Sequence, residues 1–316
     1  MRAGPVPTRL SRVNCAADPR LLPLLASLRE PAVRALASLL LGPSPWDSGV
    51  EFDRALLAGP RAAERLLALD RRPAVLLDWL AARRTGRLGA HAEALLAFWL
   101  AQRSAQLELV AANRAVRVEA HTLGEFDFLL RLDGRPLHVE MACKFYLEVA
   151  PQCWVGTDLR DALALKRAQL VRQLALAGDA RAAATLPPGF AGCPAFTVLR
   201  GQLFRPAGSG EPVHWWRHQG EAWPARAADS RYLHLLRLDW LSPARAGRAD
   251  VQTAAELQAR LAGRREALMV AEMQAVGDDD WQEVSRGFVV PAHWPEPGRL
   301  ATLMARIAAL DGGEKE

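Results

Sequence analysis

Cysteine is scarce in this sequence, and long apolar runs are missing. The four cysteines show no CxxC spacing and no neighbouring histidine pattern, which excludes a typical zinc site or disulfide framework. The N-terminus carries Arg2, Pro5 and Pro7 and no continuous apolar segment, and no run elsewhere is long enough to span a bilayer. We therefore expect a cytoplasmic protein with reduced thiols, without a signal peptide and without a membrane partner.

Lysine is also scarce. Of 40 basic residues in a chain of 316, only Lys144, Lys166 and Lys315 are lysines, and all the others are arginines. The two side chains differ in reach, hydration and ability to shift their pKa, so each interior lysine is a candidate for a place where a guanidinium does not substitute. Lys144 and Lys166 are therefore candidate functional residues, whereas Lys315 lies in the polar C-terminal tail. The net charge of +5 is a weak indication of an anionic partner.

The order of the expected elements indicates a mixed α/β protein. We expect an N-terminal helical region over residues 1–85, a core over residues 86–205 and an α+β extension over residues 206–316. Apolar periodicity places helices at 31–41, 52–69, 73–84, 89–102, 158–177, 253–262 and 297–310. It places strands at 107–110, 116–131, 136–147, 195–204, 232–240, 267–274 and 287–290.

The segment Leu132-Asp133-Gly134-Arg135 predicts a tight hairpin, because Asp-Gly between two alternating apolar runs favours a short turn. Counting outward from this turn pairs Phe128 with Val139 and Asp127 with Glu140. Side chains alternate along a strand, so the two acids are expected on one face with Cβ atoms about 5 Å apart.

Two carboxylates at that separation repel by roughly 3 kcal/mol at an effective dielectric constant near 20. A divalent cation would turn the repulsion into coordination, since Mg²⁺ takes hard oxygen ligands and typically one or two carboxylates together with substrate phosphates. The alternative is that this face of the hairpin is simply solvated and its acids have no special role. The sequence leaves both alternatives open.

Glu93 is a third candidate acid. On the helix expected to start near Gly89, it shares a stripe with Leu96 and Leu100. A glutamate in an apolar stripe needs a partner, and a metal site would supply one. A glutamate that reaches solvent from the border of the helix is equally compatible with the pattern.

Three motifs together resemble the PD-(D/E)XK nuclease superfamily, and most of all its Holliday-junction-resolvase-like branch. They are Gly89...Glu93, Gly124-Glu125-Phe126-Asp127 and Val139-Glu140...Lys144. The resemblance implies a restriction-endonuclease-like αβββαβ core and a phosphodiesterase that acts on DNA or RNA. It implies that Asp127, Glu140 and Glu93 bind Mg²⁺ or Mn²⁺, and that Lys144 positions the water or steadies the charge on the phosphate.

The sequence departs from the superfamily pattern at the lysine. The superfamily lysine usually stands two residues after the glutamate, where this chain has Ala142, and Lys144 lies about 7 Å further along the same face of the strand. The alternative that the protein is a nucleic-acid-binding relative without catalysis therefore stays open. On the following helix, Lys166, Gln169 and Gln173 form a stripe that resembles the substrate-contacting helix of several superfamily branches, although an ordinary solvent face gives the same pattern.

Over most of its length the chain also resembles an uncharacterised bacterial family, domain of unknown function 1853, for which no activity is known. Residues 123–128, 142–147 and the helix after Gly156 carry this resemblance. A third possible class is an interaction scaffold built from the N-terminal helices and the Trp-rich last third. In that last third, the run from His214 to His218 suggests metal binding or base stacking, but core packing is favoured. The sequence leaves the oligomeric state open.

Overall fold

The computed structural model describes residues 17–83, 85–102, 106–118, 121–208 and 214–312, so Cys15 and Lys315 lie outside the described residues. Contacts between residues divide the chain into two compact units. The first comprises Met1–Lys144 and Gln169–Gly201, and the second comprises Phe145–Ala168 and Gln202–Glu316. These units are groups of contacting residues, whereas the three segments expected from the sequence are continuous stretches of chain. The three-segment division stays a prediction.

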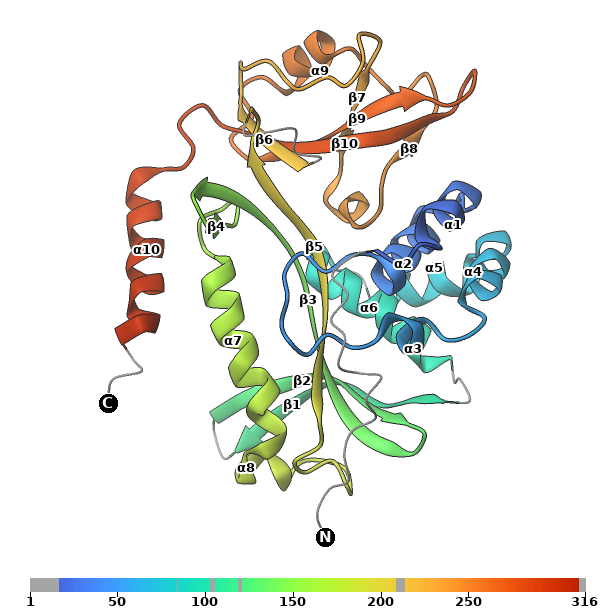
Figure 1. Ribbon diagram of the computed structural model, residues 1–316, viewed down its shortest axis with the longest axis vertical. Coiled ribbons are helices and arrows are strands. Elements are labelled where there is room, and N and C mark those ends of the chain that lie inside the picture. The colour runs from blue at the N-terminus through green and yellow to red at the C-terminus, as the bar shows by residue number, and fades with distance from the viewer. Residues whose placement is uncertain (1–16, 84, 103–105, 119–120, 209–213, 313–316) are drawn as a thin grey trace. The chain divides into compact units, whose positions relative to one another are not determined.

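The first unit opens with a group of helices that lie together in Figure 1. The buried helix α2 shows why they form. Pro31 occupies its first turn, the Glu30 side chain accepts the Ala32 N–H, and Gly42 follows its last residue. The expected helix 52–69 is wrong, because Gly59 with φ of 78° turns the chain between α3 and α4. The helices are α1 (Leu21–Ser27), α2 (Pro31–Leu41), α3 (Arg54–Ala58), α4 (Ala62–Arg71), α5 (Ala74–Ala81) and α6 (Leu88–Ala101).

The sheet of the first unit has the neighbour order β1-β2-β3-β5. Its strands are β1 (Leu107–Val118), β2 (His121–Leu132), β3 (Arg135–Ala150) and β5 (Ala195–Pro206), of which β3 and β5 continue into the second unit. The expected strand 116–131 is wrong, since the chain reverses between Val118 and His121 and β1 pairs antiparallel with β2. Alternation alone does not locate a reversal within a long strand-like pattern.

Helix α7 (Leu163–Ala175) begins later than expected. The Asp158 carboxylate accepts the Arg160 N–H at 3.1 Å within a turn, and Leu159 has φ of 56°, so the chain is not helical there. The short elements η2 (Leu176–Gly178) and α8 (Ala180–Ala183) follow. Together with β1 and β2 they enclose a core cluster of the first unit, which contains Val116, Phe126, Leu129, Leu176, Ala177, Ala182 and Phe190.

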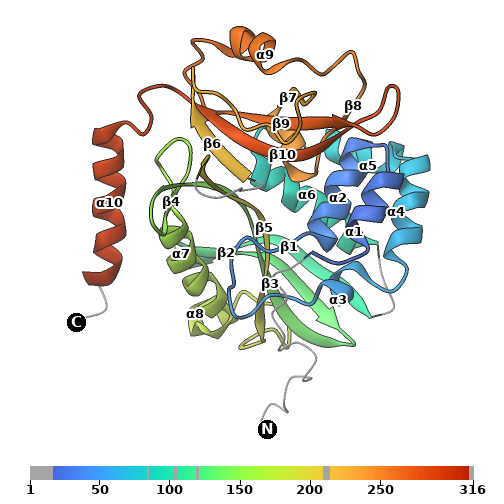
Figure 2. The same ribbon diagram turned by 45° about the horizontal axis from the view of Figure 1, so that its top comes forward.

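The second unit contains a mixed sheet with the neighbour order β5-β6-β10-β9-β7. Strand β6 runs parallel to β5 and β10, whereas β9 pairs antiparallel with β10 and β7. Figure 2 shows the β9–β10 hairpin and α9. The elements are β4 (Cys153–Val155), β6 (His214–His218), β7 (Arg231–Leu235), η3 (Arg237–Leu241), β8 (Arg245–Ala246), α9 (Ala254–Leu261), β9 (Leu268–Ala275), β10 (Trp281–Val290) and α10 (Pro297–Gly312).

The aromatic residues of the second unit build its core. Trp215 is fully buried in a cluster with Leu257 of α9, and the His218 ring nitrogen lies 2.7 Å from the Trp294 carbonyl oxygen. Core packing is therefore confirmed for Trp215, whereas the other residues of the His214–His218 segment are half-buried. The predicted mixed α/β class is also confirmed. Among the helices of the described residues, none combines the length and the apolar character needed to cross a bilayer.

Candidate functional site

The turn between β2 and β3 is a tight hairpin turn, as predicted. Asp133 and Gly134 have φ of 48° and 77°, and two successive positive φ angles are typical of a type I′ turn. Asp and Gly tolerate these angles, and the turn matches the twist of the two strands. Phe128 pairs with Val139, so the predicted register of the hairpin is confirmed.

Asp127 and Glu140 stand one residue beyond the last pair of the ladder, and each acid contacts the main chain of the opposite strand. The Met141 N–H donates to Asp127 Oδ2 at 2.8 Å, and the Asp127 N–H donates to Glu140 Oε1 over a longer 3.4 Å. The regular ladder ends at the pair before them. Carboxylate oxygens thus take the place of main-chain carbonyls as acceptors, and both acids lie at the same point of the hairpin.

The face of β3 that carries Glu140 is buried. Glu140 and His138 are 0% exposed, and Ala142 and Tyr146 are nearly so. The alternative of a solvated face is therefore wrong for Glu140, while Asp127 is half-buried. The reason is that β3 lies between β2 and β5, and strands in the interior of a sheet are often covered on both faces.

His138 belongs to this site and is not among the site residues predicted from the sequence. Its Nε2 lies 2.5 Å from Glu140 Oε1, and the Phe126 ring packs edge-on against it with centroids 4.7 Å apart. Burial lowers the pKa of His138 to about 4, and the smaller effect of the Asp127 charge raises it. Within the described part of the chain nothing hydrogen-bonds to Nδ1, so we place the proton on Nε2, where it donates to Glu140.

Position offers a signal for His138. It stands two residues before Glu140, and alternation puts both side chains on the same face of β3. A neutral imidazole with its proton on Nε2 can hold a carboxylate oxygen in one orientation. His138 therefore fixes Glu140, as ring and carboxylate groups around metal sites commonly do for each other.

Glu93 is half-buried on α6 and reaches strand β1, where its Oε2 accepts from the Asn113 side-chain amide at 3.4 Å. Its charge is also felt on β3. Burial raises the pKa of the Cys143 thiol to about 12, the charges of Arg200 and Lys144 lower it, and the charge of Glu93 raises it. The charges of Glu93 and Lys144 thus both affect the Cys143 thiol on β3.

The described residues contain no group of three or more His, Cys, Asp or Glu side chains that could hold a metal ion. The structure brings Asp127 and Glu140 together through their main-chain hydrogen bonds. Glu93 accepts from a residue of a different strand. A metal held by protein groups at this point would therefore rest on two carboxylates, with Glu93 as a further ligand still a prediction.

The basic and amide candidates differ in exposure. Lys144 is half-buried on β3, and Lys166 is buried on α7, where it shares a side with the buried Leu170. Gln173 is half-buried and Gln169 is exposed. The solvent-face alternative is therefore wrong for Lys166, and the three α7 candidates do not form one uniformly exposed stripe.

The fold and these residues define a mixed α/β protein that carries two adjacent acids on a β-hairpin beside a buried neutral histidine. The chain belongs to the family described as Domain of unknown function (DUF1853), whose model matches residues 34–290. No curated protein and no solved structure matches the chain.

Proposed function

We propose that the protein is a metal-dependent phosphodiesterase that acts on DNA or RNA. The observation that carries this proposal is that Asp127 and Glu140 each accept a main-chain N–H of the opposite strand at one point of the hairpin, with Glu140 fully buried. Burying a carboxylate beside another acid costs free energy, which the hydrogen bonds to the main chain and to His138 offset only in part. Costly placements of titratable groups are concentrated at functional sites.

The donor set suits Mg²⁺ or Mn²⁺. Mg²⁺ commonly keeps several waters and takes one or two carboxylates plus substrate phosphates, so two protein acids are enough. Asp127 and Glu140 would hold the ion, with Glu93 as a further ligand. The bound ion would supply Lewis-acid polarisation of the phosphate and an activated water. In this proposal His138 keeps the Glu140 carboxylate oriented, and the half-buried Asp127 leaves the pair open to solvent on one side.

The order of the elements supports a restriction-endonuclease-like core of the PD-(D/E)XK superfamily. The chain follows the order αβββαβ in the elements α6, β1, β2, β3, α7 and β5, with the short β4 added before α7. The neighbour order β1-β2-β3-β5 puts the strand of Glu140 inside the sheet. Membership of that superfamily is part of this proposal, as is a cytoplasmic location.

Lys144 completes the proposed chemistry. Ala142 stands where the superfamily lysine is usual, and its small side chain leaves room for Lys144 to lean back toward Glu140. There the ammonium would position the attacking water or steady the charge on the phosphate. Lys166 and Gln173, with the exposed Gln169, would contact the substrate backbone from α7. The net charge of +5 is in keeping with an anionic substrate.

A cleavage screen over single-stranded, duplex and branched DNA and over RNA, with Mg²⁺ or Mn²⁺ and with a chelator, tests the proposal. Asp127→Asn and Glu140→Gln should each lower the cleavage rate by about a hundredfold or more, since removing one electrostatic group from an active site costs on the order of 10²–10³ in rate. Asp133→Asn and Glu125→Gln are matched controls, because both acids are exposed on the same hairpin. They should cleave like the wild type.

Direct ion binding provides a second measurement. Mn²⁺ binding followed by electron paramagnetic resonance should be present in the wild type and in Glu125→Gln and lost in Asp127→Asn. Nucleic-acid binding that chelation does not change, without cleavage, would instead favour an inactive relative of the nuclease fold. Neither binding nor cleavage would point to an interaction scaffold. Either of these results overturns the proposal of an active enzyme.

A further inference from the structure

Gly201 on β5 lies against the main chain of Lys144 on β3. Its φ is +115°, and a Cβ built on it would lie 1.8 Å from the Lys144 carbonyl oxygen and 2.7 Å from the Lys144 nitrogen. Such distances are far below van der Waals contact, so any side chain at position 201 would push the two strands apart at Lys144. The sequence signal is a glycine within an apolar strand pattern, which often marks a close approach of two backbones.

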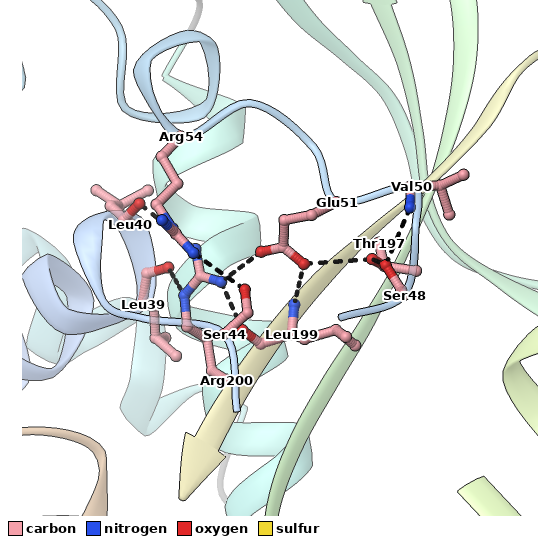
Figure 3. A network of polar contacts seen from close by, with 10 residues as sticks. All are labelled: Leu39, Leu40, Ser44, Ser48, Val50, Glu51, Arg54, Thr197, Leu199 and Arg200. Carbon is pink, nitrogen blue, oxygen red and sulfur yellow. Dashed lines mark hydrogen bonds and ion pairs between the residues drawn. The ribbon is translucent and has the colours of Figure 1, made fainter. Parts of the chain in front are cut away.

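Arg200, the residue before this glycine, is held by a buried ion pair (Figure 3). Its Nη1 lies 2.8 Å from Glu51 Oε1, and the two side chains are only 4% and 5% exposed. Its Nε donates to the Leu39 carbonyl at 2.6 Å and its Nη2 to that of Leu40 at 3.5 Å. Both carbonyls belong to the last turn of α2, where the partial negative charge of a helix end favours a cation.

Glu51 in turn is held by β5. Its Oε2 accepts from the Leu199 N–H at 3.2 Å and from the Thr197 hydroxyl at 3.3 Å, and that hydroxyl lies 2.6 Å from Ser48 Oγ. The main chain adds two bonds, from Thr197 N–H to the Val50 carbonyl and from the N–H of residue 52 back to the Thr197 carbonyl. Residues 197–200 of β5 are thus tied both to the end of α2 and to residues 48–52 (Figure 3).

We infer that the Arg200–Glu51 pair and Gly201 are positioning residues for Lys144. The ion pair fixes β5 against α2. Because Gly201 of β5 lies against the main chain of Lys144, the position of β5 also sets the position of that main chain. The inference rests on the proposed function, in which Lys144 supplies the cation of the site. Lys144 stands two positions beyond the usual place of the superfamily lysine. The position of its main chain therefore decides how far its ammonium group can reach toward the site.

The scarcity of lysine provides the test. Labelling with ¹³C,¹⁵N-lysine gives three lysine spin systems in NMR spectra, and Lys144→Arg identifies the one that belongs to Lys144. Gly201→Ala should shift the amide and side-chain signals of Lys144 and leave those of Lys166 and Lys315 in place. Gly189→Ala is the matched control, because Gly189 also has a positive φ of +88° but no atom within 4 Å of an added Cβ. It should leave Lys144 unchanged.

Gly201→Ala risks failing to fold, so Thr197→Val provides a milder variant of the same network, and Glu51→Gln a stronger one. Each loosens the network without adding volume, and each should move the Lys144 signals in the same selective way. Folded variants in which Lys144 keeps its wild-type signals would overturn the inference. The NMR measurement does not depend on cleavage. Shifted Lys144 signals in a protein without nuclease activity would overturn only the proposed function. Unshifted Lys144 signals in an active nuclease would overturn only the positioning role. In an active protein, Gly201→Ala should lower kcat more than it raises KM.

Discussion

The main-chain N–H of Met141 donates to the carboxylate of Asp127 across the β2–β3 hairpin, at 2.8 Å. Asp127 therefore acts as part of the sheet as well as part of the candidate site. The two roles need different properties of the side chain. The hydrogen bond needs an oxygen at that position, whereas metal binding needs the negative charge.

Asp127→Asn and Asp127→Ala should separate these roles. Asparagine keeps an oxygen for the Met141 N–H, so we expect the free energy of unfolding to change by less than about 1 kcal/mol. Alanine leaves that N–H without its acceptor and should cost about 1–3 kcal/mol. Urea unfolding measures both values, and Glu125→Ala, at an exposed acid of β2, should stay within about 0.5 kcal/mol of the wild type. Equal losses for asparagine and alanine would contradict the role of the hydrogen bond.

We expect the free energy of unfolding to fall as the pH is lowered, because of His138. Its pKa is about 4 in the folded protein, below the ordinary value of 6.5, so the unfolded chain binds the proton more readily. The contribution of His138 to the free energy of unfolding is fully present above pH 6.5 and is lost as the pH falls from 6.5 to 4. At 1.36 kcal/mol per pKa unit it amounts to about 3 kcal/mol.

Urea unfolding at pH 7.5, 6, 5 and 4.5 in the wild type and in His138→Gln measures this contribution. The carboxylates Asp127 and Glu140 also face the ring and are present in both proteins, so the difference between the two pH profiles reports on the histidine. Glutamine cannot take up the proton, and the variant should lose the part of the slope between pH 6.5 and 4. Parallel profiles would mean that His138 is not buried in its neutral form.

The hairpin could be predicted from the sequence because its geometry depends on neighbouring residues. Asp133 and Gly134 accept the positive φ angles of the turn, and the pairing of Phe128 with Val139 follows by counting. The bounds of α2 follow from Pro31 and Gly42 in the same way. Local chemistry decides these features, so a single sequence is enough to predict them.

The burial of Glu140 and the identity of the strand that contacts Gly201 could not be predicted in this way. Both depend on β5, which is distant from β3 in the sequence and whose neighbours in the sheet no local pattern reveals. The role of His138 was missed for the same reason, since a histidine on a solvated face and one buried beside a carboxylate look alike in sequence. The start of α7 was misplaced because Asp158 caps a turn as readily as a helix.

Lys144→Arg should impair cleavage far more than its conserved charge suggests. The guanidinium is larger, planar and differently hydrated, and a half-buried position on β3 leaves little freedom to place it. Losing a positioned cationic group of this kind is expected to lower kcat/KM by on the order of a hundredfold, as for a single electrostatic group. Initial rates with Mg²⁺ measure the effect, and Lys315→Arg in the C-terminal tail is the matched control. Normal cleavage by Lys144→Arg would show that Lys144 is not catalytic.

The buried Arg200–Glu51 pair should behave differently from the exposed Arg61–Glu64 pair at the start of α4. Breaking a buried pair leaves a charge without compensation and costs about 3–5 kcal/mol, so Arg200→Met and Glu51→Gln should each be strongly destabilising. The double variant should lose less than the sum of the two, by at least about 1 kcal/mol, because the second change removes the stranded charge.

The same substitutions at the exposed pair, Arg61→Met and Glu64→Gln, should each stay within about 1 kcal/mol and add without coupling, since solvent screens charges that are 76% and 66% exposed. Urea unfolding of all six variants at pH 7 compares the two cycles. Additive losses at Arg200 and Glu51 would mean that the two side chains stabilise the unit through separate contacts. In that case the carbonyls of α2 and the hydroxyl of Thr197, and not the ion pair, would hold β5 in place beside Lys144.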